Sequence, residues 1–179
     1  VYKRTGDESF VKLSTPFDTA PSGAVESVAF SPDSTYLAVA HASDPFLTIY
    51  RPATSGDFEF TRMTSFTSGL TAGSLSVRFS SSGTYLALGN SNLNGNTTYL
   101  HVYKRNVSNN NYDKLSSAID SLSLPTSMVY EVAFSKDENY LAVALGSSPY
   151  IGIYKRTGDS SFTKLANPVD LPPFLPCAR

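Results

Sequence analysis

One stretch of the sequence, Val28-Ala29-Phe30-Ser31-Pro32-Asp33-Ser34-Thr35-Tyr36-Leu37-Ala38-Val39-Ala40, decides the fold, because the chain contains close variants of it three times. The second version runs Val77-Arg78-Phe79-Ser80, a short turn, and then Tyr85-Leu86-Ala87-Leu88-Gly89. The third runs Val132-Ala133-Phe134-Ser135, a turn, and then Tyr140-Leu141-Ala142-Val143-Ala144. A repeat of this kind, roughly fifty residues long, predicts an architecture of repeated supersecondary units.

Each repeat reads as four short β-strands. In the first repeat, Val28-Ala29-Phe30 alternates in polarity and leads into polar turn residues. The next strand, Tyr36–Ala40, is apolar at nearly every position, which is typical of a strand buried on both faces. A third strand ends in a tyrosine such as Tyr50, and a fourth follows the next turn, as in Phe162–Leu165. Four strands in a unit of about 40–50 residues form the blade of a β-propeller.

The stretch Val28–Val39 resembles the V-x-F-S-P-D-G-x-x-L-A opening of WD-repeat and YVTN-type propeller blades, in the divergent style of bacterial and phage repeat proteins. WD repeats end their third strand in Trp-Asp, whereas this chain has no tryptophan and places Tyr103-Lys104-Arg105 or Tyr154-Lys155-Arg156 there. The resemblance implies an all-β fold, a β-propeller section of about three four-stranded antiparallel blades. It implies no single function, because propellers serve as scaffolds, lectins and enzymes alike.

The register of the repeats predicts a single domain that forms part of a propeller. We expect a preceding blade to end within residues 1–24, three blades at 25–66, 67–118 and 119–165, and a connection toward a further blade at 166–179. Known propellers close with about 4–8 blades, so three blades leave sheet faces open to association. We therefore expect further blades, either from a longer chain or from a partner such as a second copy.

Composition excludes several classes of function. The net charge of −1 and the 16% of charged residues give no clustered positive surface for nucleic acid. No apolar run approaches the ~20 residues that a membrane-spanning helix needs, so we expect no membrane insertion. The single cysteine, Cys177, allows no internal disulfide and no thiolate metal site. We expect no cofactor.

Basic residues recur at one position of the repeat, where the third strand ends. Alternation along a strand sends one residue of each Lys-Arg pair outward. One interpretation is that they are solvated edge charges that discourage sheet pairing; the other is a binding rim for sulfated or acidic glycans. The residues of this candidate binding rim are Lys3, Arg4, Arg51, Lys104, Arg105, Lys155 and Arg156.

Other candidate site residues are few. Phe46 and Tyr150 follow turn prolines and could anchor a ligand from the face that bears these turns. The two histidines, His41 and His101, lie at different places in the repeat, so we expect no acid–base pair and no catalytic or metal-ligating residues.

The sequence thus favours a non-enzymatic structural or interaction module, a rigid propeller scaffold that binds protein or glycan in a virion or on a cell surface. Two alternatives stay open. One is a lectin-like propeller that binds glycans. The other is a lactonase-like propeller enzyme with its site outside this segment, since the inner strands here offer only Ser27, Ser76 and Glu131.

Overall fold

The computed structural model describes residues 1–14, 16–53, 59–66, 68–91, 98–115, 119 and 123–167. All fourteen elements named among these residues are β-strands. Within the same residues, no helix has the length and apolar character needed to cross a membrane. The expected all-β fold is confirmed.

Each repeat forms one four-stranded antiparallel sheet with its strands in chain order. Blade 1 consists of β3 (Val25–Phe30), β4 (Leu37–His41), β5 (Leu47–Pro52) and β6 (Phe60–Arg62). Blade 2 consists of β7 (Ser74–Phe79), β8 (Tyr85–Asn90), β9 (Leu100–Asn106) and β10 (Asn111–Lys114). Blade 3 consists of β11 (Val129–Phe134), β12 (Tyr140–Leu145), β13 (Ile151–Gly158) and β14 (Ser161–Lys164). The remaining sheet, the N-terminal hairpin, consists of β1 (Tyr2–Gly6) and β2 (Ser9–Lys12).

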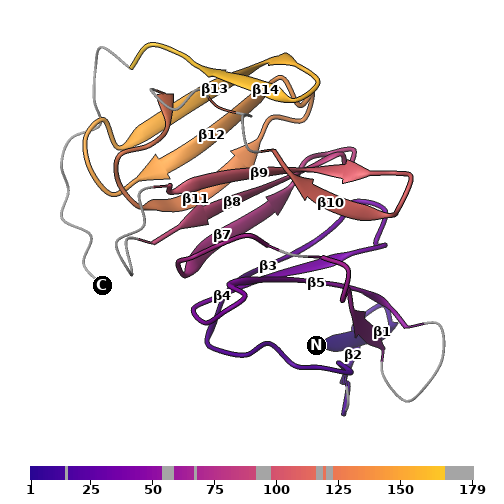
Figure 1. The fold of residues 1–179 in the computed structure, drawn as a ribbon. Helices are drawn as coiled ribbons and strands as arrows, with labels where there is room; N and C mark the ends of the chain where they lie inside the picture. Colours follow the sequence, from indigo (N-terminus) through magenta and orange to yellow (C-terminus); the bar gives the residue numbers. More distant parts are fainter. Residues whose placement is uncertain are drawn as a thin grey trace.

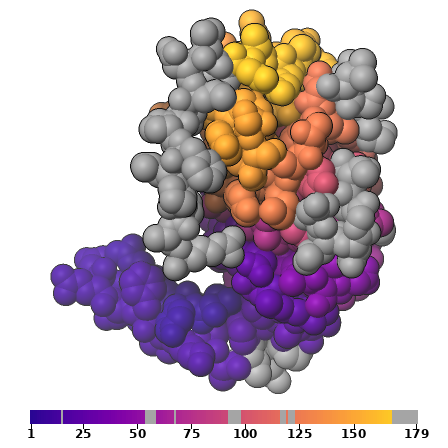
Figure 2. Space-filling view, turned by 90° about the vertical axis from the view of Figure 1, so that its left-hand side faces the viewer, coloured from indigo at the N-terminus to yellow at the C-terminus, as the bar shows by residue number. Residues whose placement is uncertain are grey.

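The three blades stack face to face in chain order, with the N-terminal hairpin beside blade 1 (Figure 1). The space-filling view shows the N-terminal part of the chain projecting from the side of this stack (Figure 2). The hairpin corresponds to the third and fourth strands of a blade, since Arg4 pairs with Phe10 as Arg156 pairs with Phe162 in blade 3. It therefore occupies the outer part of a preceding blade position.

The core lies between the sheets. One buried cluster joins blades 1 and 2, with Tyr36 and Ile49 packed against Leu86. A second cluster joins blades 2 and 3 and includes Tyr85 and Leu141. All five residues of β4 and all six of β8 are buried, as expected for strands covered on both faces.

Small residues in the second strands let the sheets approach closely. A Cβ atom added at Gly89 would lie 2.5 Å from the carbonyl oxygen of Val129 in blade 3. Ala38 and Ala87 are completely buried at the same kind of position. Gly89 is therefore a point of close contact between blades 2 and 3.

Tyrosines at the third strands tie each blade to the segment that leads into it. The hydroxyls of Tyr50, Tyr103 and Tyr154 donate to the backbone carbonyls of Thr19, Ser68 and Ser123, at 2.9, 2.6 and 2.9 Å. Burial raises the pKa of the Tyr50 and Tyr154 phenols to about 12. These phenols therefore remain neutral hydrogen-bond donors at ordinary pH.

One expectation about the core is wrong. The repeat places Phe30 with Phe79 and Phe134 among residues that should be buried between blades, yet Phe30 is 55% exposed. Phe79 and Phe134 are half-buried because each packs against a preceding blade. Phe30 instead borders a groove beside the N-terminal hairpin, and the described residues place no second strand there to cover it.

This difference predicts unequal effects of truncation. Leu86→Ala should lower the free energy of unfolding by about 2–5 kcal/mol, because it leaves a cavity in a completely buried contact. Phe30→Ala, at an exposed face, should cost under about 1 kcal/mol. Urea titrations measure both values, and equal losses would contradict the placement of the core between blades.

Candidate functional site

The turn between the first two strands of a blade fixes a carboxylate in place. In blade 1, Ser31 Oγ donates to Asp33 Oδ1 at 2.6 Å and accepts from the N–H of Tyr36 at 2.9 Å. The N–H of Thr35 donates to the same Asp33 oxygen at 3.0 Å. These hydrogen bonds, the one from Ser31 first, hold the pKa of Asp33 at about 2. Asp33 is therefore a fixed negative charge at the edge of blade 1.

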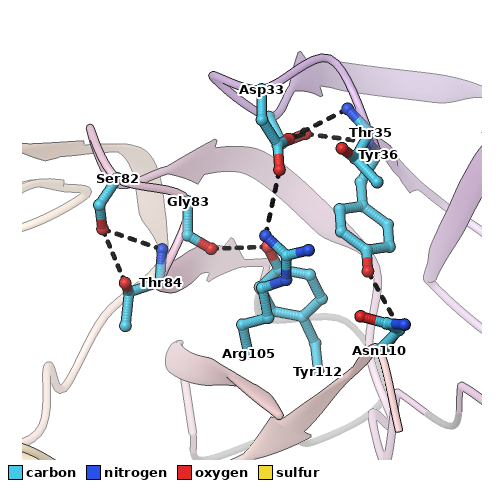
Figure 3. Close-up of polar contacts among 10 residues, drawn as sticks. Asp33, Thr35, Tyr36, Ser82, Gly83, Thr84, Arg105, Asn110 and Tyr112 are labelled. Carbon is cyan, nitrogen blue, oxygen red and sulfur yellow. Dashed lines mark hydrogen bonds and ion pairs between the residues drawn. The ribbon is translucent and has the colours of Figure 1, made fainter. Parts of the chain in front are cut away.

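An arginine of blade 2 forms an ion pair with this carboxylate. Arg105, at the end of β9, donates from Nη1 to Asp33 Oδ2 at 3.1 Å and lies over the ring of Tyr36, 5.1 Å from its centroid (Figure 3). Tyr112 packs edge-on against the same ring at 5.4 Å, and the Tyr36 hydroxyl donates to the Asn110 carbonyl at 3.1 Å (Figure 3). We call this arrangement a tyrosine joint: a second-strand tyrosine held by an arginine, a ring and a turn carbonyl of the next blade.

The same joint connects blades 2 and 3. Arg156 lies 5.8 Å from the centroid of the Tyr85 ring, and Phe162 packs edge-on against that ring at 5.7 Å. The Tyr85 hydroxyl donates to the Asp159 carbonyl at 2.7 Å. Lys104, which pairs with Tyr85 in the sheet register, forms an ion pair with the Asp159 carboxylate.

Most of the basic residues of the candidate binding rim contact other groups of the chain. Four of the seven form ion pairs: Lys3 with Glu59, Arg4 with Asp7, Lys104 with Asp159 and Arg105 with Asp33. A fifth, Arg156, donates to the Glu138 carbonyl at 3.0 Å. Arg51 and Lys155 are exposed and have no ion pair among the described residues. Lys3, Lys104 and Arg105 hold carboxylates of neighbouring elements, and Arg105 and Arg156 lie over tyrosine rings.

The two aromatic residues proposed as ligand anchors are also not brought together. Phe46 is half-buried against the core between blades 1 and 2. Tyr150 is half-buried at the border of a groove on the outer face of blade 3. Both have positive φ angles, 65° and 62°, which place them at equivalent turn positions of two different blades.

The inner strands carry a polar cluster that the sequence did not indicate as a unit. Arg78 Nη2 pairs with Glu131 Oε1 at 3.0 Å, and Arg78 Nη1 donates to Ser27 Oγ at 3.1 Å. Ser76 Oγ donates to the same Glu131 oxygen at 2.9 Å. Ser27, Ser76 and Glu131 could be identified from the sequence as inner-strand polar residues, but Arg78 could not, since it stands where the other blades have alanine. One guanidinium therefore links the inner strands of all three blades.

Neither histidine takes part in this cluster. His41 is fully buried with Nε2 at 2.9 Å from Thr48 Oγ1, and burial lowers its pKa. His101 borders a cavity of about 240 Å³ beside Leu100 and Lys114. Burial, with a smaller contribution from Lys114, lowers the pKa of His101 to about 3, so the imidazole is neutral. Within the described ranges, no three His, Cys, Asp or Glu side chains converge as a metal site would require.

Both ends of the stack present open apolar faces. A groove of about 310 Å³ lies against blade 1, bordered by Val28, Phe30 and Leu37 from the blade and by Val1 from the hairpin. On blade 3, a groove of about 380 Å³ is lined mainly by apolar side chains, including Val143 and Ile151. Both grooves are bordered by residues of the first and second strands of their blades, among them Val28 and Leu37 in blade 1 and Val132 and Val143 in blade 3.

Comparison with known proteins supports the assignment of the fold. The sequence profile of the WD domain, G-beta repeat matches residues 12–51. No curated protein sequence matches the chain. The match to the profile covers the end of β2 and the first three strands of blade 1.

Solved structures match over most of the chain. A candidate 6-phosphogluconolactonase from Bacteroides uniformis superposes with a TM-score of 0.60 at 15% identity, covering 88% of this chain and 45% of its own. A candidate 6-phosphogluconolactonase from Bacteroides fragilis superposes with a TM-score of 0.64 at 18% identity, covering 89% of this chain and 43% of its own. The chain is therefore a β-propeller repeat protein that spans less than half the length of these two structures.

The hydrogen-bonded carboxylate of Asp33 predicts an acid-sensitive stability. The pKa of Asp33 is about 2 in the folded chain, against an ordinary value of 3.8. The ionised carboxylate therefore stabilises the fold fully at a pH above 3.8, and this stabilisation is lost as the pH falls toward 2. Asp33→Asn should lower the unfolding midpoint at pH 6 and reduce the further loss between pH 4 and pH 2. Thermal unfolding followed by circular dichroism measures this.

Asp44→Asn, which removes a carboxylate outside the joint, is the matched control for this experiment. If the Asp33 and Asp44 variants gave the same pH profile, the Asp33 carboxylate would have no special part in acid stability.

Proposed function

We propose that this chain is a non-enzymatic structural and interaction module, a rigid β-propeller section that binds protein through its open blade faces. The proposal is supported by the contacts between blades that already occupy the charged and aromatic side chains. Arg105 and Arg156 are engaged in holding one blade to the next, through Tyr36 and Tyr85. Groups committed to structure in this way do not supply the converging acid, base and nucleophile that catalysis needs.

The chemistry of the open faces favours a protein partner. Val28 and Phe30 border one groove and Val143 and Ile151 the other, so both offer apolar surface. Contiguous exposed apolar surface on a folded protein marks a site of protein contact. A glycan site on the basic residues has less support, because most of these cations are paired within the chain.

A lactonase-like enzyme is the second candidate, and one observation favours it. The Arg78–Glu131 pair lies on the inner strands with both side chains partly exposed, and the two structural neighbours are candidate 6-phosphogluconolactonases. The pair is balanced in charge and has no histidine beside it in the described residues. We therefore assign it a structural role, linking the inner strands.

An assay of lactone hydrolysis distinguishes these two functions. We expect the chain to leave the spontaneous rate of 6-phosphogluconolactone hydrolysis unchanged, and Glu131→Gln to behave identically. Glu26→Gln, which changes an exposed glutamate of β3, is the control. A rate above that of buffer that falls in Glu131→Gln but not in Glu26→Gln would identify an enzyme and overturn the proposal.

A titration with a sulfated polysaccharide examines the lectin-like alternative. We expect no saturable binding at physiological salt, because exposed Arg51 and Lys155 are isolated charges whose attraction is screened. Saturable binding that weakens in both Arg51→Ala and Lys155→Ala would support a glycan-binding propeller instead. Calorimetry measures the binding.

A further inference from the structure

Each end of the described stack carries half of a tyrosine joint without its counterpart among the described residues. Tyr36 and Tyr85 are 2% and 1% exposed, because the next blade covers them. Tyr140, the equivalent residue of blade 3, is 38% exposed and has no arginine or ring packed on it among the described residues. Blade 3 therefore offers a tyrosine without the partners that the other two blades receive.

The N-terminal hairpin offers those partners. Arg4 and Phe10 are opposite each other in its register, as Arg105 and Tyr112 are in blade 2. The side chain of Arg4 is 61% exposed and Phe10 is 64% exposed. The contacts of the Arg4 guanidinium lie within the hairpin itself, where it pairs with Asp7 and donates to the Gly6 carbonyl at 3.0 Å.

The hairpin also repeats the sequence that forms the joint between blades 2 and 3. Its segment Tyr2-Lys3-Arg4-Thr5-Gly6-Asp7 is identical to Tyr154-Lys155-Arg156-Thr157-Gly158-Asp159. In the latter segment, Arg156 lies over Tyr85 and Asp159 pairs with Lys104.

Blade 3 also carries the lysine that would pair with the aspartate of a docked hairpin. Lys155 pairs with Tyr140 in the sheet register, just as Lys104 pairs with Tyr85, and Lys155 is exposed. A hairpin docked in the same way would bring Asp7 to Lys155, Arg4 over the Tyr140 ring and Phe10 against its edge. The two open halves are complementary in charge and in shape.

We infer that blade 3 binds the N-terminal hairpin of a second copy of this chain, joining copies head to tail through a third tyrosine joint. The inference specifies the partner that the proposed interaction module binds, and it rests on that proposal. Lys3 is directed toward Glu59 of its own blade 1, so the opposite face of the hairpin, with Arg4 and Phe10, is free to contact the next copy. The contact is heterologous, so it propagates into a ring if the rotation closes and into a filament if it does not.

Two single variants test the joint. The wild-type chain should show a concentration-dependent mass above 19.3 kDa in sedimentation velocity. Tyr140→Ala and Arg4→Ala should each weaken this association on the order of tenfold, since each removes a cation–π contact. Val107→Ala, at an exposed residue of the blade 2 turn outside both halves, should leave the association unchanged.

Mixing the variants is the decisive experiment. A Tyr140→Ala chain retains its hairpin and an Arg4→Ala chain retains its tyrosine, so one intact joint can form between them. At a concentration where each variant alone is monomeric, the mixture should contain a one-to-one dimer and nothing larger. Circular dichroism and an unchanged unfolding midpoint establish that both variants are folded.

Three results would overturn the head-to-tail joint: a wild-type chain that remains monomeric, single variants that associate like the wild type, or a mixture that remains monomeric. None of them bears on lactone hydrolysis. A folded monomer without lactonase activity would therefore reject the second copy as partner and leave the interaction module standing, whereas lactonase turnover would reject the module itself.

Discussion

The constraint on which this structure depends is that a blade has two apolar faces, which are covered mainly by neighbouring blades. The second strand sits between sheets, so β4 and β8 are buried along their whole lengths. Burial of apolar area is the dominant favourable contribution to folding, and here the two larger buried clusters lie between neighbouring repeats. Where the described residues place no further blade, as beside Phe30, the apolar face stays exposed.

The Lys-Arg dipeptide shows how one short sequence can serve two contacts. Successive residues of a strand point to opposite faces of the sheet. Lys104 reaches forward to Asp159 of blade 3, while Arg105 reaches back to Asp33 of blade 1. Exposed ion pairs contribute little by themselves, but these two lie beside buried tyrosine rings and determine which part of one blade meets the next.

The strands and their order could be predicted from the sequence, because hydrophobic alternation and turn residues are local signals. Each of the three repeats contains these signals at the same positions. The tyrosine joint could not be predicted from the sequence, because its arginine and its tyrosine lie 69 or more positions apart, as for Arg105 with Tyr36 and Arg156 with Tyr85. Residue spacing also does not indicate toward which face of the sheet each side chain points. The burial expected for Phe30 failed for a related reason. A repeat predicts an average environment, and the exposure of a given copy depends on whether its neighbour is present.

Arg78 was missed because it breaks the repeat, where blades 1 and 3 have Ala29 and Ala133. Its guanidinium contacts Ser27 of blade 1 and Glu131 of blade 3, so one side chain connects three inner strands. The tyrosine joints connect the same blades at the turns between their first and second strands. A stack held together at two separate places resists hinge motion between its sheets more than either contact would alone. Because preorganised surfaces lose less entropy on binding, this bracing would favour the docking proposed for the open faces.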